Sequence, residues 1–83
     1  MSPALVSAPL SAEQARAESI GYQALAYVSK RLPLQVLCSA AGHYIGTADA
    51  EGPVSRESVS YFRSLRAAEH ALRTGRWQQS LNP

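Results

Sequence analysis

Proline and glycine divide this chain into short segments, and that division limits its fold more than any other feature. Pro33 ends a helical pattern, since a proline disfavours the α-region for the residue before it. Gly42 closes a hairpin connection, Gly52 and Pro53 belong to a turn, and Gly75 stands where a helix C-terminal cap belongs. The segments between these residues leave room for one helix, three short strands and a second helix.

The first segment has the pattern of an amphipathic helix. Ser11 and Gln14 form a capping-box pair, with the serine as N-cap and the glutamine at N3. Gly21 lies within the helix that this pattern predicts, where a glycine costs about 1 kcal/mol relative to alanine. We expect that a strand or a second helix approaches closely there. The apolar residues at helical spacing are Ala17, Ile20, Ala24, Tyr27 and Val28.

Alternation of side chains predicts three strands in the middle of the chain. The first covers residues 34–39, the second 43–48, and the third lies within 54–62, most clearly at 59–62. Ser64 is suited to cap a closing helix whose apolar stripe is Leu65, Ala68, Ala71 and Leu72. We therefore predict an α+β fold: a two-layer α-β-β-β-α sandwich in which a three-stranded antiparallel sheet carries both helices on one face.

The chain of 83 residues is long enough for one domain with a small core. We expect a flexible N-terminal arm at 1–10, a domain at 11–77 and a C-terminal tail at 78–83. Cys38 is the single cysteine, so it has no partner for an internal disulfide, and with His43 and His70 it does not make a zinc set. We expect no metal and no cofactor, so stability must come from packing or from self-association. A charged fraction of 17% favours a homodimer or a protein partner.

Two features bear on location. No apolar run approaches the roughly 18 residues of a membrane span, and the first residues lack the basic and apolar regions of a signal peptide. A lone cysteine agrees with a reducing compartment. We expect a cytoplasmic protein without a membrane segment.

The residue types of a catalytic triad occur near one another, but nothing in their spacing pairs a nucleophile with a base. They are His43, Asp49, Ser55 and Ser58. A nucleophile elbow and a phosphate-binding GxxxxGK pattern are both absent from the sequence. We expect a protein that is not an enzyme.

Arginines in the closing helix are the first candidate binding residues. Arg66, His70 and Arg73 fall at i, i+4 and i+7, and Arg63 precedes the helix. Such a basic ridge either recognises phosphates or an acidic protein patch, or is the solvated side of an amphipathic helix.

Two tyrosines and a further arginine are the second candidate set. If Tyr44 and Tyr61 share an open sheet face, they form a stacking platform or a protein hot spot, and otherwise they belong to the core. Residues 55–58 predict an exposed polar segment. Within it, Arg56 is the residue that we expect to contact a partner.

The order of elements, Gly52-Pro53 before the third strand and the alanine-rich closing helix "RSLRAAEHALRTG" resemble the double-stranded-RNA-binding domain. That resemblance implies recognition of RNA by its shape. Arg63 and Arg66 stand where that family has a lysine cluster.

Four segments, "YIGT", "GPVSRES", "YF" and "AAEHALRTGRW", are similar to short proteins of plasmids, integrative elements and phages of proteobacteria. This second resemblance implies a role in binding, such as inhibition of a host defence complex of the CRISPR type. We therefore expect a binding protein for a protein partner, with nucleic-acid binding as the alternative. The expected contact residues are Tyr44, Arg56, Tyr61, Arg63, Arg66 and Arg73.

Overall fold

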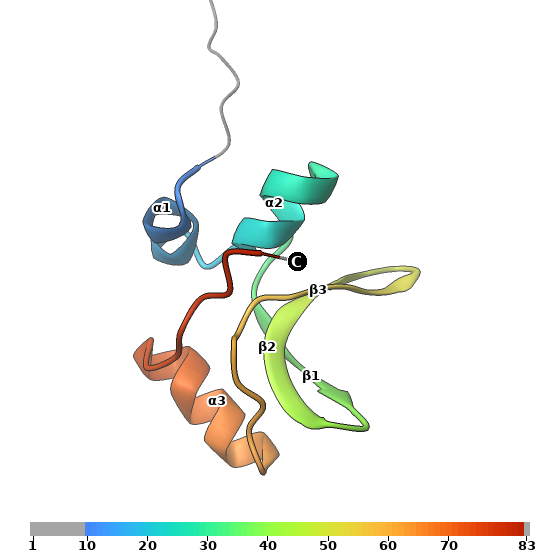
Figure 1. Ribbon diagram of the computed structural model, residues 1–83, viewed down its shortest axis with the longest axis vertical. Helices are drawn as coiled ribbons and strands as arrows, with labels where there is room; N and C mark the ends of the chain where they lie inside the picture. The colour runs from blue at the N-terminus through green and yellow to red at the C-terminus, as the bar shows by residue number, and fades with distance from the viewer. Residues whose placement is uncertain (1–9, 83) are drawn as a thin grey trace, which may run out of the picture.

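The computed structural model describes residues 10–82, so the expected N-terminal arm at 1–10 lies almost wholly outside the described residues. The fold class is confirmed: a three-stranded antiparallel sheet in the order β1-β2-β3 is combined with helices in an α+β arrangement (Figure 1). In chain order the elements are α1 (Ala12–Ala17), α2 (Tyr22–Val28), β1 (Gln35–Ser39), β2 (Gly42–Asp49), β3 (Gly52–Arg56) and α3 (Leu65–Thr74).

The capping box at the start of the chain is confirmed, but the helix that follows is broken into α1 and α2. The Ser11 side chain accepts from the Gln14 N–H, and the Gln14 side chain accepts from the Ser11 N–H. Ser19 then takes a left-handed conformation with φ 57°. Its C=O accepts from the N–H of Leu34 at 2.8 Å, and Ile20 forms an isolated bridge with Pro33. Contact with the chain before β1 therefore ends α1 after fewer than two turns.

Gly21 is the N-cap of α2 and does not lie in the middle of a helix. A Cβ placed on it would lie 2.4 Å from Thr47 Cγ2 and 2.6 Å from Glu57 Oε2. The expected reason for this glycine, a close approach of the sheet, is correct. Its expected position within one continuous helix is wrong.

The first two strands agree with prediction within a residue at each end, but the third does not. β3 ends at Arg56, and the expected strand at 59–62 is absent from the structure. Past β3 the N–H groups of Glu57 and Ser58 both donate to the C=O of Ile45, at 2.8 and 2.9 Å. This doubled contact interrupts the ladder, and the chain returns to β2 only at Phe62, which pairs with His43.

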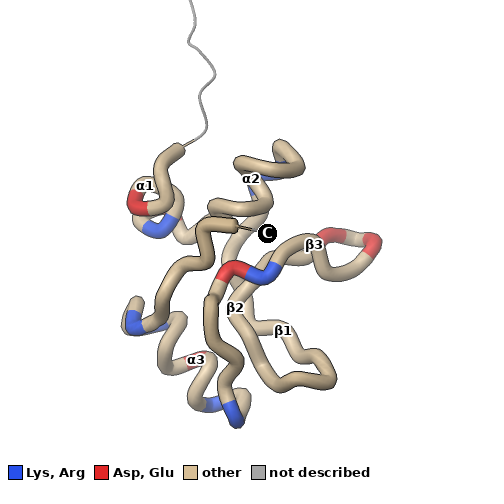
Figure 2. Tube along the Cα trace, in the orientation of Figure 1, with Lys and Arg blue, Asp and Glu red and all other residues tan. Residues whose placement is uncertain are grey.

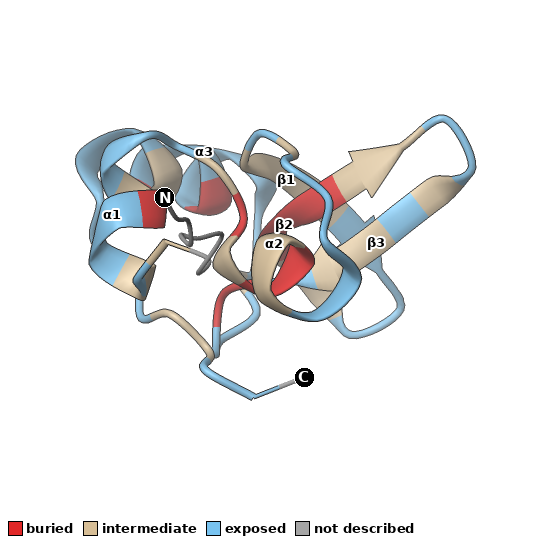
Figure 3. Ribbon diagram, turned by 90° about the horizontal axis from the view of Figure 1, so that it is seen from above, coloured by how far each residue is buried: buried red, intermediate tan, exposed pale blue. Residues whose placement is uncertain are grey.

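Strand register assigns each side chain to one face of the sheet. Val36 is paired with Ile45, so these side chains share the face toward the helices, while Leu37 and Tyr44 share the opposite face. We call the first the helix face and the second the open face. Ile45 is the largest of the fully buried apolar side chains among the described residues. Figure 3 shows the buried segments gathered between the helices and β2.

Small residues make up most of the remaining core, namely Ala15, Ala24, Ala68 and Ala71. The apolar stripe of α3 is narrower than predicted. Its first member, Leu65, is 49% exposed because it begins the helix at the edge of the buried side. With so little apolar volume inside, polar contacts must contribute a large share of the stability.

A tail was expected at 78–83, but residues 78–82 are part of the hydrogen-bonded structure. The Val59 N–H donates to Gln78 O at 2.9 Å, and the Ser80 N–H donates to Glu57 O at 2.7 Å. Arg16 of α1 contacts Trp77 in two ways. Its guanidinium lies 3.9 Å from the centroid of the Trp77 ring and donates a hydrogen bond to the Trp77 C=O. The C-terminal segment therefore joins α1 to the region that follows β3.

An ion pair between Lys30 and Asp49 joins the segment after α2 to the end of β2. The hydrogen bond from Lys30, with one from the Glu51 N–H, holds the pKa of the Asp49 carboxyl below its ordinary value. A group with a lowered folded-state pKa contributes stability above its unfolded pKa, and that contribution is lost as the pH falls through the folded value. We expect Lys30→Ala to raise the Asp49 pKa toward its ordinary value in a carboxyl NMR titration.

Arg31→Ala is the matched control for this titration, because Arg31 pairs with Glu18 and not with Asp49. It should leave the Asp49 pKa unchanged. An Asp49 titration that is the same in wild type and Lys30→Ala would contradict the ion pair.

Candidate interaction surface

The helix α3 is delimited by the two caps that the sequence predicts. The Ser64 side chain accepts from the Ala67 N–H at 3.1 Å, and Gly75 takes the left-handed conformation with φ 75°. Ala68 and Ala71 are buried against the rest of the domain. These contacts determine which side of the helix faces the solvent.

Arg66, His70 and Arg73 lie on the side of α3 opposite its buried alanines, and all three are exposed. We call these three residues the α3 basic face. An Arg73 guanidinium nitrogen lies 3.2 Å from His70 Nδ1. With Glu69 they line a shallow depression along the outside of the helix. The depression presents two guanidinium groups and one carboxylate from a single rigid element.

The four cations before residue 63 are all engaged by other groups of the protein. Lys30 and Arg31 pair with carboxylates. Arg16 and Arg56 donate to backbone C=O groups and lie over aromatic rings. The four arginines from residue 63 to residue 76, in contrast, form no ion pair within the described part of the chain. The unpaired positive charge is therefore concentrated on and beside α3 (Figure 2).

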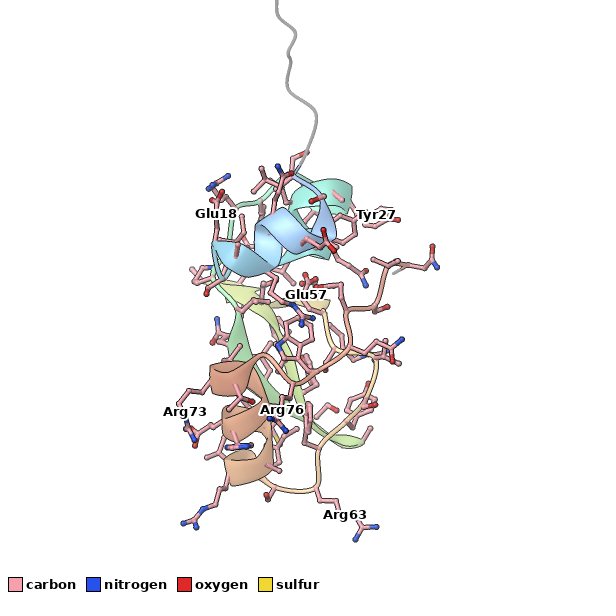
Figure 4. The ribbon with its side chains drawn as sticks, turned by 90° about the vertical axis from the view of Figure 1, so that its left-hand side faces the viewer. Glu18, Tyr27, Glu57, Arg63, Arg73 and Arg76 are labelled. Atoms are coloured by element: carbon pink, nitrogen blue, oxygen red, sulfur yellow. The ribbon has the colours of Figure 1, made fainter. Side chains whose placement is uncertain are left out.

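Arg63 and Arg76 flank the helix but do not extend the α3 basic face in one direction. Figure 4 shows Arg63 at the lower end of the molecule, pointing away from Arg73, with Arg76 near the other end of α3. Of the arginines expected to act together, Arg66 and Arg73 share one side of the helix. Arg63 is separated from them.

The three expected contact residues of the sheet also lie together, but on the open face. The rings of Tyr44 and Tyr61 pack edge to face with centroids 5.8 Å apart, and the Arg56 guanidinium lies 5.0 Å from the Tyr61 centroid. Arg56 also donates to the C=O groups of Ser58 and Val59 at 2.6 and 2.8 Å. Tyr44 is 7% exposed and Tyr61 42%, so the first is core and the second is accessible. This set lies across the sheet from α3, so the six expected residues do not form a single surface.

A buried polar centre around Glu57 is the main feature that sequence reasoning missed. Glu57 and Ser58 are fully buried, which corrects the expectation of an exposed segment at 55–58. The Glu57 carboxylate accepts from the N–H groups of Gln23 and Ala24, at 2.9–3.2 Å, and therefore caps α2. It also accepts from the Ser55 hydroxyl at 2.6 Å and the Gln79 amide at 2.7 Å. Nothing in the sequence near Glu57 indicates partners so far along the chain.

Thr47 extends this centre, since its hydroxyl lies 2.6 Å from Ser55 Oγ. The Ser55 hydroxyl donates to Glu57, so it accepts from Thr47. Figure 4 shows Glu57 between the α1–α2 pair and the sheet. The centre joins α2, β2, β3 and the C-terminal segment, and its role in the structure is to hold them together.

Of the four residues with triad side chains, the two serines and the aspartate are committed to other contacts. Ser58 Oγ accepts from the Ile45 N–H at 3.1 Å and donates to Ser60 O at 2.8 Å. Asp49 pairs with Lys30. His43 Nδ1 is buried without a hydrogen-bond partner in the described part of the chain. Neither serine is therefore hydrogen-bonded to a histidine within residues 10–82.

Comparisons with protein-family models, curated proteins and solved structures found no match to this chain. Among the described residues, no helix is both long enough and apolar enough to span a bilayer. The function must therefore be inferred from the surfaces of the protein itself.

Proposed function

We propose that this chain is a small non-enzymatic binding protein that docks an acidic surface of a partner protein through the α3 basic face. The observation that carries the proposal is the contrast in charge pairing. The four cations before residue 63 are bound within the domain, while Arg66 and Arg73 form no ion pair with a carboxylate of residues 10–82. Arginine is suited to such a contact, because its planar fork binds carboxylates through two hydrogen bonds.

Glu69 favours a protein over a nucleic acid as the partner. It lies in the same depression as Arg66 and Arg73, so any phosphate chain that crossed α3 would pass close to a carboxylate. A protein surface of mixed charge can instead present a cation to Glu69 and carboxylates to the arginines. Residues 63–76 hold four arginines and one glutamate, whereas the rest of the chain is slightly acidic, so no second basic surface supports a long duplex.

A more specific form of the proposal is that this chain inhibits a host defence complex. In that case the acidic surface belongs to a subunit of the complex. The alternative, recognition of duplex RNA, would use the same arginines as phosphate contacts.

The test is a charge reversal with a control of equal charge. Arg66→Glu/Arg73→Glu and Lys30→Glu/Arg31→Glu both change the net charge from +2 to about −2, but only the first alters the α3 basic face. Tagged wild type and both variants are used to capture proteins from nuclease-treated bacterial lysate. Each captured protein is then purified and titrated against the three chains. We expect at least about tenfold weaker binding for the α3 variant alone, because reversing charges in a complementary contact costs more than 1.4 kcal/mol.

Two outcomes would overturn the proposal. One is a captured partner that binds wild type and the α3 variant with equal affinity. The other is binding of a 20-base-pair RNA or DNA duplex with a log–log salt slope of about 0.9 for each phosphate neutralised, which would establish the alternative.

A further inference from the structure

The pairing of β2 determines which backbone groups of its neighbour β1 are free. His43 exchanges both backbone hydrogen bonds with Phe62, at 2.7 and 3.1 Å. The C=O of Ile45 accepts from Glu57 and Ser58 on the same side. The backbone groups of His43 and Ile45 therefore point away from β1.

The partners of these two residues in β1 are Cys38 and Val36. In an antiparallel ladder the N–H and C=O of one residue point to the same side, and opposed residues alternate between bonded and non-bonded pairs. Val36 and Cys38 therefore direct their N–H and C=O groups outward, away from β2. No described residue donates to or accepts from these groups. The outer edge of β1 is an unpaired strand edge.

The two edges of the sheet differ in how they are protected from pairing. β3 carries Pro53 and Arg56, and its register with β2 is broken between Thr47 and Ala48. Prolines, charges and bulges are the usual means by which proteins prevent an edge from pairing. β1 has the sequence QVLCS, without a charge, a proline or a register break. As far as residues 10–82 show, only the β1 edge is open to another strand.

We propose that β1 pairs antiparallel with β1 of a second copy of this chain, with the two-fold axis at Leu37. In this register Val36 of each copy lies opposite Cys38 of the other. Because both residues present their N–H and C=O outward, two such pairs form four backbone hydrogen bonds. The two Leu37 residues meet on the axis as a non-hydrogen-bonded pair. The product is a continuous six-stranded sheet.

The composition of β1 favours a second copy as the occupant. A strand that pairs with itself places like residues near the axis, and like charges there would be destabilising. Here the residues next to the axis are Val36, Leu37 and Cys38, all uncharged. Five paired residues from each chain bury less than the roughly 1,200 Å² of a standard interface. The dimer should therefore be reversible and should form with increasing protein concentration.

Cysteine cross-linking tests both the pairing and its register. In a Cys38→Ser background, Leu37→Cys places two thiols in a non-hydrogen-bonded pair with Cα atoms about 4.5 Å apart, within the range for a disulfide. We expect a covalent dimer to form rapidly under mild oxidation. Ser39→Cys in the same background is the control, because its two copies would lie about 14 Å apart along the strands. Cross-linking that is equal in both variants, or absent from the first, overturns the proposed register.

A proline tests the backbone contact without a cross-link. The Cys38 N–H makes no bond within residues 10–82, so Cys38→Pro should leave the β1–β2 hairpin intact while removing two hydrogen bonds of the dimer. In sedimentation equilibrium we expect wild type and Cys38→Ser to dimerise alike, and Cys38→Pro to dimerise at least about tenfold more weakly. Circular dichroism checks that each variant is folded. A wild type that stays monomeric up to about 1 mM, a concentration at which association of about 4 kcal/mol is already visible, would overturn the proposal. So would equal dimerisation of the wild type and both variants.

Discussion

Glu57→Ala should destabilise the domain by about 3–5 kcal/mol. The substitution removes the only acceptor within residues 10–82 for the N–H groups of Gln23 and Ala24 at the start of α2, and it also removes one hydrogen bond each from the Gln79 amide and the Ser55 hydroxyl. All of these donors lie inside or at the edge of the core, where an unsatisfied polar group costs about 1–3 kcal/mol. A domain of this size has a total stability of about 4–12 kcal/mol, so this loss is a large share of the total.

Urea denaturation measures this loss as a shift of the midpoint at constant slope. Glu69→Ala is the matched control, since it removes an exposed glutamate and should change the stability by no more than about 0.5 kcal/mol. Glu57→Gln separates hydrogen bonding from volume. Its amide fills the same space but turns a donor toward the N–H groups of α2, so we expect a loss of about 1–3 kcal/mol. If Glu57→Ala proved as stable as Glu69→Ala, the buried centre would not hold the fold together.

Gly21→Ala should have the second largest effect, a loss of about 3 kcal/mol. The added methyl would overlap Thr47 Cγ2 and Glu57 Oε2, which a Cβ would approach to 2.4 and 2.6 Å. Distances below 3.0 Å force the backbone or its neighbours to move, and here the neighbours are the fully buried residues of the polar centre. Thermal unfolding should show a strongly lowered midpoint.

Two further variants identify the cause of that loss. Gly75→Ala adds a methyl where nothing lies within 4 Å, so only its left-handed φ of 75° opposes the change and the loss should be about 1 kcal/mol. Thr47→Ser keeps the hydroxyl that binds Ser55 and removes the methyl nearest to Gly21. Added to Gly21→Ala, it should restore part of the stability. Equal losses for the two glycine substitutions would show that steric overlap is not the reason for glycine at position 21.

The features that the sequence predicted correctly are local ones. The capping box of Ser11 and Gln14, the N-cap Ser64 and the left-handed Gly75 all depend on groups within four residues of one another. The β1–β2 hairpin is equally local, because its strands are joined by two residues. Side-chain periodicity was sufficient to place Arg66 and Arg73 on the solvent side of α3.

The predictions that the structure corrects have a common cause, because each was overridden by contacts between residues that are distant in the sequence. The break between α1 and α2 arises where Ser19 binds the chain before β1, and no helical periodicity reports that contact. The strong β-propensity of residues 59–62 predicts the third strand there. The ladder is interrupted at Glu57 and Ser58, so β3 ends before these residues. Intrinsic preference yielded to the hydrogen bonds of the folded chain.

The candidate interaction surface also combines a local feature, which the sequence predicts, with a feature that depends on distant residues. The spacing of Arg66, His70 and Arg73 was enough to predict a basic side of a helix, because that spacing is a property of the helix alone. The spacing does not show whether these arginines form ion pairs with other residues of the domain. Arg16, Lys30 and Arg31 find their partners in residues that are remote in sequence, and that pairing singles out α3.

By itself, the sequence determined the fold class, the caps, the first two strands and the solvent side of the last helix. Each of these follows from the preference of a residue for its own backbone conformation or from a periodicity of 2 or 3.6 residues. Only the tertiary structure decided that Glu57 is buried, which side chains lie against Gly21 and that the β1 edge is unpaired. These features depend on contacts between groups that are 20 to 60 residues apart in the sequence. The free energy of such contacts is set by desolvation and geometry, which the local sequence does not encode.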